Sequence, residues 1–321
     1  MTNLPREIFS NDLILGNICP NIVQMLIADK RSENTKKAYE RDLTHFSRKM
    51  LNGDPTPELI STFLTLEQFE AFQLVMSYKA MMLENGLSEA TVNRRLAAVR
   101  SLVNLARRMG HCSYDLKDVT GEKNKAYRDT SGITVKQMKA MLDVPKDVIA
   151  KDIRDFAILR ILWENALRRS EVVKLNVEDF NAEDRTLAIL GKGRGSQKEK
   201  VSISEKVAEA VLKWLSVRGD VQPNEPLFIA LDRATKGSKR ITGEGLAQMI
   251  ATIGKQAGIS KKVTPHMIRH TSITAALEAT NGNVSAVQKL SRHAKVETVM
   301  IYDDNRTDKQ KEVTTLLADL F

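Results

Sequence analysis

The first third of the chain alternates apolar and polar positions with the period of an α-helix. Capping side chains in Ser32–Thr35 precede the first helix, and the Gly- and Pro-containing segment 52–57 breaks it. Two further helices are predicted, from about 66 to 83 and from 88 to 110. This part should therefore be a helical domain. The stripe of the first helix recurs at i, i+4, i+7 and i+11 and consists of Tyr39, Leu43, Phe46 and Met50.

The third predicted helix has an unusual charged face. Its apolar side chains gather on one side, and between Thr91 and Gly110 it contains no acidic residue. A solvated helix face usually mixes charges of both signs, because like charges repel. An unmixed face is better explained by phosphates opposite it, although the solvated alternative stays open. The basic residues are Arg94, Arg95, Arg100, Arg107 and Arg108.

A polar, helix-poor stretch at 118–132 separates this part from the rest of the chain. Such composition is typical of an interdomain linker. We therefore predict a helical DNA-binding domain over residues 1–122, a linker over 123–130 and a second domain over 131–321.

The second domain should be mixed. Thr134 can cap a short helix, and the apolar stretch 154–163 predicts a buried helix. Two β-branched and apolar runs, 185–190 and 199–203, predict strands joined by the Gly-rich turn 191–196. The remainder alternates helical stretches with short loops. The predicted fold class is mainly α with a small antiparallel β-sheet in the second domain.

Composition and charge indicate a partner. The chain has a formal net charge of +9, with 42% hydrophobic and 28% charged residues, and a pI of about 9.4. These values are typical of a globular protein with an acidic partner, such as nucleic acid or an anionic membrane surface. Cys19 and Cys112 are too few for a disulfide scaffold or a zinc site, and no signal peptide or membrane-spanning run is visible. We expect a cytoplasmic, nucleoid-associated protein.

The second domain contains a series of basic residues and a tyrosine that could act on one phosphodiester. His266 and Arg269 are three residues apart and share one face of a helix, and Tyr302 follows His293 by nine residues. Together such groups can hold a phosphate and attack it with a phenol, and no set of metal ligands accompanies them. In chain order the candidates are Arg168, Lys192, His266, Arg269, His293 and Tyr302.

Each candidate also has a structural explanation. Arg168 precedes a helix for which Ser170 is the expected N-cap, and an arginine there can simply pair with a carboxylate. Glu171 is expected to orient that helix or Arg168 rather than to react. His270 is expected to pack or hydrogen-bond structurally, and the tyrosine is one of five in the chain. The role of the turn lysine could fall to Arg194 or Lys198.

Taken together, these motifs resemble those of the tyrosine recombinase (phage integrase) family. The resemblance spans most of residues 30–305 and points to a simple Xer- or Cre-like member. In the first domain, 34–43 and 91–96 resemble helices of the family's small SAM-like, core-binding domain. In the second, the matching segments are 166–171 (first arginine), 191–193 (hairpin lysine), 264–270 (His-x-x-Arg) and 288–293 (last histidine), followed by Tyr302.

The resemblance implies a role for each candidate. Arg168 and Arg269 would hold the non-bridging phosphate oxygens, and Lys192 would protonate the departing 5′ oxygen. His266 would exchange a proton with the attacking phenol of Tyr302, while the last histidine donates a hydrogen bond to the phosphate. The product would be a 3′-phosphotyrosyl bond and a free 5′ hydroxyl. This chemistry implies no cofactor, no metal and no ATP.

The resemblance also implies an assembly. The two domains would form a C-shaped clamp on duplex DNA with inverted half-sites. Four protomers, each a monomer or weak dimer when free, would exchange strands through a Holliday junction for integration, excision or resolution. An accessory DNA-bending protein is a possible partner, and no separate arm-binding domain is expected. The apolar tail in 306–321 would dock on a neighbouring protomer or on its own domain. The alternatives are a type IB topoisomerase and a catalytically idle DNA-binding protein on the same fold.

Two positions depart from the family pattern. Ser291 and Arg292 precede His293 where the family commonly has Leu-Gly, and a glycine would permit a tight turn there. Arg292 is expected to reach a phosphate instead. Arg169 replaces a usually apolar residue and is expected to face solvent or DNA. The predicted DNA-contacting residues are therefore Arg94, Arg95, Arg100, Arg107, Arg108, Arg194 and Arg292.

Overall fold

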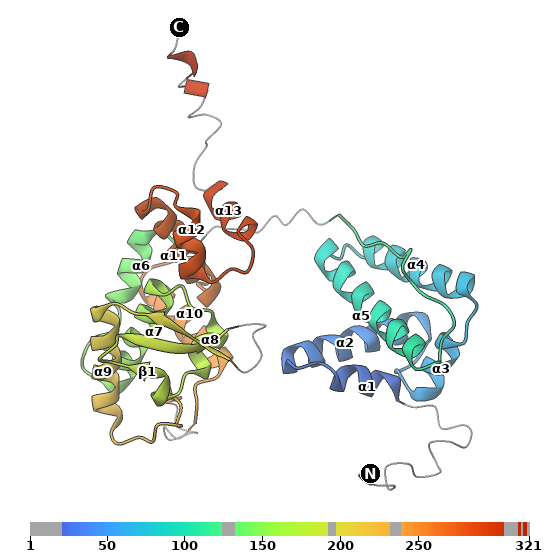
Figure 1. Ribbon diagram of the computed structural model, residues 1–321, viewed down its shortest axis with the longest axis horizontal. Helices are drawn as coiled ribbons and strands as arrows, with labels where there is room; N and C mark the ends of the chain where they lie inside the picture. Colours follow the sequence, from blue (N-terminus) through green and yellow to red (C-terminus); the bar gives the residue numbers. More distant parts are fainter. Residues whose placement is uncertain are drawn as a thin grey trace, which may run out of the picture. The chain divides into compact units, whose positions relative to one another are not determined.

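The chain folds into two compact units, Met1–Tyr127 and Arg128–Phe321 (Figure 1). The boundary between them falls within the stretch predicted as a linker. The computed structural model describes residues 21–123, 132–191, 197–231, 239–304, 314–315 and 317–319. None of the helices in these ranges is long and apolar enough to cross a membrane.

The first unit is entirely helical where it is described. Thr56 caps α3 by accepting a hydrogen bond from the Leu59 amide, and Pro57 supplies the first helical residue, where a missing N–H has no cost. In α4, Glu67 and Glu70 form a reciprocal capping box. The helices are α1 (Ile22–Ala28), α2 (Glu33–Met50), α3 (Pro57–Leu64), α4 (Gln68–Glu84) and α5 (Glu89–Arg108).

The predicted stripe of α2 forms the centre of the first unit's core. Leu43 and Phe46 are fully buried. The Phe46 ring meets the rings of Phe63 and Tyr78 edge-on, at centroid distances of 5.0 and 5.1 Å. The buried Tyr114 hydroxyl donates to the Phe63 carbonyl at 2.8 Å. This last contact ties the segment after α5 back to α3, so the unit closes around one apolar core.

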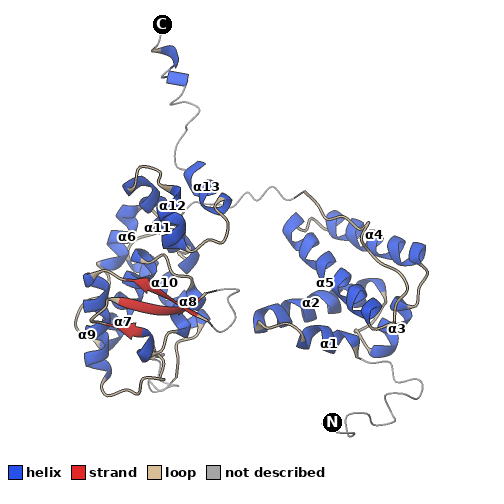
Figure 2. Ribbon diagram, viewed as in Figure 1, coloured by secondary structure: helices blue, strands red, loops and turns tan. Residues whose placement is uncertain are grey.

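The second unit is mainly helical with one small sheet, as predicted (Figure 2). Its strands are β1 (Phe180–Asn181), β2 (Thr186–Leu190) and β3 (Lys198–Ser202), preceded by a short 3-10 turn at Val177–Asp179. Its helices are α6 (Val135–Leu142), α7 (Ala150–Glu164), α8 (Arg169–Lys174), α9 (Glu205–Arg218), α10 (Gly243–Gln256), α11 (Pro265–Ala279), α12 (Val284–Ser291) and α13 (Glu297–Asp304).

The sheet is antiparallel in the order β1-β2-β3, and its register pairs Leu187 with Val201 and Ile189 with Glu199. Leu187 and Ile189 alternate with half-buried neighbours and face the core. The main core of the unit gathers around α7 and α9, which pack against each other, and includes the buried Trp214. The sheet therefore covers one side of a helical core.

A second, smaller apolar cluster lies apart from this main core. It joins α11, α12 and α13, which contact one another and lie together at one end of the unit (Figure 1). Its buried members are Ala166, Ile273, Leu277, Val287, Val299 and Tyr302. Tyr302, the candidate nucleophile, is thus buried in this small cluster and not in the main core.

Two local expectations were wrong. Ser170 is not the N-cap of α8: Arg168 occupies that position, and its main-chain N–H donates to the Glu171 carboxylate at 2.8 Å. The Glu171 carboxylate, at the third position of α8, satisfies this donor, so the helix begins two residues earlier than predicted. The sequence pattern also missed α3 and the two-residue strand β1, because both are too short to show a clear period.

Candidate active site

Arg168 is fixed at the first turn of α8 by one carboxylate. Glu171 accepts the Arg168 main-chain N–H through one oxygen and the Arg168 guanidinium through the other, both at 2.8 Å. Glu171 is 1% exposed, whereas the Arg168 side chain is 28% exposed. The expected pairing of Arg168 with a carboxylate is therefore present, but it leaves part of the guanidinium accessible.

Arg269 lies on α11, inside the second unit, and is 2% exposed. Its guanidinium donates to the main-chain carbonyls of Ala166 and Ser291 and to Nε2 of His293, the last at 3.2 Å. Ala166 precedes α8 and has a left-handed backbone with φ 46°. Arg269 thus joins three parts of the site: α11, the turn before Arg168 and the end of α12.

His293 is held in one orientation by this network. Its Nδ1 lies 3.0 Å from the Ser291 hydroxyl, and that hydroxyl contacts the Gln288 carbonyl at 3.3 Å. Because Arg269 can only donate, His293 Nε2 accepts, which assigns the ring proton to Nδ1. The expected hydrogen bond from His293 to a phosphate therefore requires a proton on Nε2.

His270 lies between His266 and Tyr302. Its Nε2 is 2.7 Å from Nε2 of His266 and 3.3 Å from the Tyr302 hydroxyl. Its ring contacts both neighbours, with centroids 4.1 Å from His266 and 4.8 Å from Tyr302. Tyr302 is 2% exposed, and the His293 ring stacks on it at 5.9 Å. His270 thus packs and hydrogen-bonds between His266 and Tyr302, in keeping with the structural role expected for it, and its Nε2 is also the nitrogen that contacts the tyrosine hydroxyl.

Arg292 does not reach the surface. Its side chain is 7% exposed and pairs with Glu171 at 3.1 Å. The residue stands in the left-handed region, with φ 54° and ψ 42°, at the C-cap of α12. The tight turn that a glycine would make is therefore formed by an arginine, and its guanidinium turns inward. The prediction that Arg292 contacts a phosphate was wrong for this reason.

The site concentrates positive charge around one buried carboxylate. Burial, and then the neighbouring cations Arg168 and Arg292, lower the pKa of Arg269 to about 10. Burial opposes ionisation of Glu171, but Arg292 and then Arg168 outweigh it and hold its pKa below the ordinary value. Three guanidinium groups thus surround Glu171, and an anion entering the site would relieve their mutual repulsion.

Lys192 and Arg194 lie outside the described residues, as does the centre of the hairpin turn between β2 and β3. Lys198, the alternative lysine, begins β3 and pairs with the buried Asp179 at 2.6 Å. That ion pair gives Lys198 a structural partner, which favours the turn lysine for a role in chemistry. Among the described residues no group of three His, Cys, Asp or Glu side chains is arranged to hold a metal ion.

The arginine face of α5 is less uniform than its sequence suggested. Arg94 pairs with the buried Asp42 of α2, and Arg95 contacts His45 at 3.0 Å. Arg100 donates to the Val119 carbonyl at 3.1 Å. A neighbouring helix and loop thus supply hydrogen-bonding partners for these three arginines, one of them a carboxylate, which supports the structural explanation for them.

At the C-terminal end of α5 the acidic partner is less buried: the Asp115 side chain is 22% exposed, against 1% for Asp42. Arg107 and Arg108 are exposed, and Arg107 has a partly exposed ion pair with Asp115 at 3.5 Å. These two arginines therefore remain the better candidates for phosphate contacts in the first unit. On α2, the half-buried His45 hydrogen-bonds Tyr78 at 2.8 Å.

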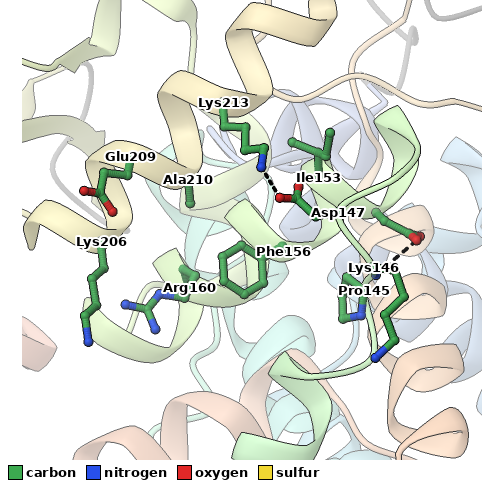
Figure 3. A pocket seen from close by; sticks show the side chains of 11 residues that line it. Pro145, Lys146, Asp147, Ile153, Phe156, Arg160, Lys206, Glu209, Ala210 and Lys213 are labelled. Atoms are coloured by element: carbon green, nitrogen blue, oxygen red, sulfur yellow. Dashed lines mark hydrogen bonds and ion pairs between the residues drawn. The ribbon is translucent and has the colours of Figure 1, made fainter.

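A separate cavity of about 440 Å³ lies between the start of α7 and α9 (Figure 3). Apolar side chains such as Ile153 and Phe156 line it. Two of the basic groups that line it have acidic partners: Lys213 pairs with Asp147 (Figure 3), and Arg160 pairs with Glu164. None of the residues around Tyr302 belongs to it, so it is not part of the site described above.

Comparison with known proteins identifies the family. Residues 132–309 match the model of the phage integrase family, and residues 23–110 match the phage integrase N-terminal SAM-like domain. The chain belongs to the phage integrase family of tyrosine recombinases. The resemblance seen in the motifs is thereby confirmed.

Two relatives match over nearly the full chain. A tyrosine recombinase of Synechococcus elongatus is 47% identical over 300 residues, covering 94% of this chain and 93% of the relative. The tyrosine recombinase XerD of Listeria innocua is 29% identical over 294 residues, covering 90% and 94%. Family membership thus applies to both units of the chain.

Solved structures agree at the level of the fold. The Tn1549 transposon integrase in complex with transposon right end DNA aligns with a TM-score of 0.62 at 19% identity, covering 88% of this chain and 93% of that one. The XerH recombinase bound to a palindromic difH substrate aligns with a TM-score of 0.62 at 16% identity, covering 94% and 96%. The predicted fold class, mainly helical with a small antiparallel sheet, is confirmed.

Proposed function

We propose that this protein is a site-specific DNA recombinase that cleaves and rejoins duplex DNA through a covalent bond to Tyr302. One observation supports this most directly: Arg168, Arg269, His266 and His293 meet Tyr302 in a single cluster with excess positive charge. A scissile phosphate is the anion that such a cluster fits, and the family chemistry requires a tyrosine beside it.

The first step forms one bond and breaks one. The Tyr302 oxygen attacks phosphorus, the bond from phosphorus to the 5′ oxygen breaks, and the DNA keeps a 3′-phosphotyrosyl ester. Arg168 and Arg269 stabilise charge on the non-bridging oxygens, which planar guanidinium groups can bind through two parallel hydrogen bonds. Losing one of these clamps should raise the barrier by about 3 kcal/mol, as for an oxyanion-hole donor. The ester conserves the energy of the broken bond, so rejoining needs no ATP.

The protons have defined destinations. The phenol proton is taken up by Nε2 of His270, 3.3 Å from the Tyr302 hydroxyl. The same nitrogen lies 2.7 Å from Nε2 of His266, so the pair of imidazoles holds the added proton and shares its charge. Lys192 of the β-hairpin turn protonates the departing 5′ oxygen, in line with the family motif at 191–193. Phosphate binding draws Arg269 away from His293 Nε2, which can then carry a proton and donate to the phosphate.

The assembly follows from the same family resemblance. The two units both bind one half-site, with Arg107 and Arg108 at the phosphates. Two protomers bind inverted half-sites, and four protomers on two duplexes exchange strands through a Holliday junction, with or without an accessory DNA-bending protein. The tail after Tyr302 is expected to dock on a neighbouring protomer or on its own domain. The DNA complexes of the Tn1549 integrase and XerH support the choice of DNA as the partner, and the site of action is the cytoplasmic nucleoid.

The proposal is tested by covalent capture. Purified protein is incubated with sheared genomic DNA from its source, denatured, and the DNA that stays attached is sequenced. We expect a small set of recurring sites with inverted half-sites, and none with Tyr302→Phe, which should still bind DNA. Capture without any recurring sequence would contradict site specificity. Equal behaviour of wild type and Tyr302→Phe in every assay would indicate an idle DNA-binding protein.

The type IB topoisomerase alternative receives no support from the relatives, which are recombinases. Its remaining test is relaxation of a supercoiled plasmid that lacks the captured sites. We expect no relaxation of that plasmid, because strand cleavage should depend on the recognised sequence.

A further inference from the structure

The backbone of Arg292 adopts a conformation that ordinarily selects glycine. Its φ of 54° and ψ of 42° place it in the left-handed region at the end of α12. A side chain is strained there, whereas glycine is not. Arg292 must therefore contribute an interaction that glycine could not supply, and its buried guanidinium identifies that interaction.

The Arg292 guanidinium joins three segments of the second unit. One nitrogen donates to the carbonyls of Asn165 at 3.2 Å and Leu290 at 2.7 Å. The other donates to the Glu171 carboxylate at 3.1 Å. These acceptors lie at the end of α7, the end of α12 and the first turn of α8. A planar group with several fixed donors suits such a junction better than an ammonium group.

This junction links the two halves of the phosphate site. The main chain of Arg292 immediately precedes His293, so the left-handed turn sets where that imidazole points. Its side chain holds Glu171, which in turn holds both the main-chain N–H and the guanidinium of Arg168. The position of His293 is thereby coupled through Arg292 and Glu171 to that of Arg168.

We propose that Arg292 is a positioning residue: it holds Arg168 and His293 in positions from which both side chains can contact the same phosphate. The inference rests on the function proposed above. It differs from a direct contact with DNA, because the charge of the Arg292 guanidinium is already balanced by its ion pair with the Glu171 carboxylate at 3.1 Å. It predicts a loss in the rate of cleavage rather than in the strength of DNA binding.

The test makes the same change, arginine to glycine, at two positions that both have a left-handed backbone. Arg292→Gly relieves the strain and removes the junction. Arg185→Gly is the matched control, because Arg185 also has a left-handed backbone, with φ 48°, but lies exposed between β1 and β2. The probe is a captured genomic fragment, and the readouts are its dissociation constant and the single-turnover rate of covalent complex formation.

We expect Arg292→Gly to slow covalent complex formation roughly 10- to 100-fold, the range for residues that orient the groups in contact with a reacting centre. DNA affinity should change less than about threefold, since no phosphate contact is lost. Arg185→Gly should match wild type in both. A wild-type rate in Arg292→Gly, or an equal loss in the control, would overturn the proposal.

Arg292→Lys provides a second variant in case the glycine variant does not fold. It keeps the buried charge but only part of the guanidinium's hydrogen bonds, so its cleavage rate should lie between those of wild type and Arg292→Gly at unchanged DNA affinity. A wild-type rate in Arg292→Lys would exclude a need for the planar junction.

A readout without DNA separates the proposal from the recombinase function. Inorganic sulfate should raise the urea midpoint of wild type and Arg185→Gly more than that of Arg292→Gly, because the wild-type cluster is positioned to bind one oxyanion. Equal stabilisation of all three would overturn the proposal. If sulfate stabilises wild type but wild type never captures DNA, the result contradicts the proposed function and leaves the positioning role of Arg292 standing.

Discussion

Replacing Glu171 with glutamine tests the electrostatic basis of the site. Glu171 is the carboxylate that the guanidinium groups of Arg168 and Arg292 share, and it also accepts the Arg168 main-chain N–H. Glutamine has nearly the same shape, but one of its two terminal groups is a donor and meets another donor. The substitution therefore removes the counter-charge of the cluster and at least one hydrogen bond, without leaving a cavity.

The cost can be estimated from these contacts. Breaking a fully buried ion pair costs about 3–5 kcal/mol, and the accessible part of Arg168 reduces this through solvent screening. We expect Glu171→Gln to lower the free energy of unfolding by about 2–4 kcal/mol at pH 7. With a urea dependence of about 2–3 kcal/mol per molar, the midpoint should fall by about 1 M.

The assay is urea unfolding followed by tryptophan fluorescence. The chain has two tryptophans, Trp163 on α7 and Trp214 on α9, so the signal follows the second unit alone. Glu183→Gln is the control, since it makes the same change on an exposed carboxylate of that unit.

The pH dependence provides a stricter check. Because the folded pKa of Glu171 is lowered, its contribution is present above the unfolded value of 4.5 and is lost as the pH falls through the folded value. The difference in free energy of unfolding between wild type and Glu171→Gln should therefore be largest near neutral pH and become smaller only in acid. The reasoning would be refuted if the loss in free energy of unfolding caused by Glu171→Gln stayed constant from pH 7 into acid. A loss no larger than that caused by Glu183→Gln would refute it as well.

Four further outcomes are expected. Tyr302→Phe should change the free energy of unfolding by about 1 kcal/mol or less, because it loses one hydrogen bond to His270, while denaturing gels should detect no covalent DNA complex. Arg107→Gln or Arg108→Gln should each reduce the slope of log affinity for DNA against log salt by about 0.9 per lost phosphate contact. Arg100→Gln should leave that slope unchanged and lower stability, since its guanidinium holds the Val119 carbonyl. The first unit should lose stability as the pH falls from 8 to 5, because burial and then the Arg95 cation lower the pKa of His45 from 6.5. Its neutral form is therefore favoured in the fold, and circular dichroism should show no such loss in His45→Gln.

Much of the fold could be predicted from local patterns. The stripe through Leu43 and Phe46, the cap at Thr134 and the alternation around Leu187 and Ile189 each reflect the period of one element. The family motifs also pointed to Arg168, Arg269 and Tyr302 as members of one site. In these cases the sequence pattern and the tertiary structure agree because each side chain faces the direction that its own helix or strand dictates.

The errors arose where a side chain meets a partner far away in the chain. The arginines of α5 looked unpaired because Asp42, which lies on α2, is distant in sequence. Arg292 looked like a surface cation because nothing nearby in sequence indicates that its guanidinium reaches Glu171. The place of His270 between His266 and Tyr302 likewise depends on the fold and could not be predicted from its neighbours in sequence. Periodicity within one element carries no information about such pairings.

The small cluster that contains Tyr302 has a consequence for how activity responds to heat. Within the described residues, α13 contributes only Val299 and Tyr302 to that cluster, which is separate from the main core. Burying one valine and one tyrosine stabilises the docked helix by about 3–5 kcal/mol, less than the stability of a typical domain. The helix should therefore detach as an independent folding unit while the remainder of the domain stays native. Strand cleavage should then fail on warming several degrees below the main melting transition, and it should return fully on cooling.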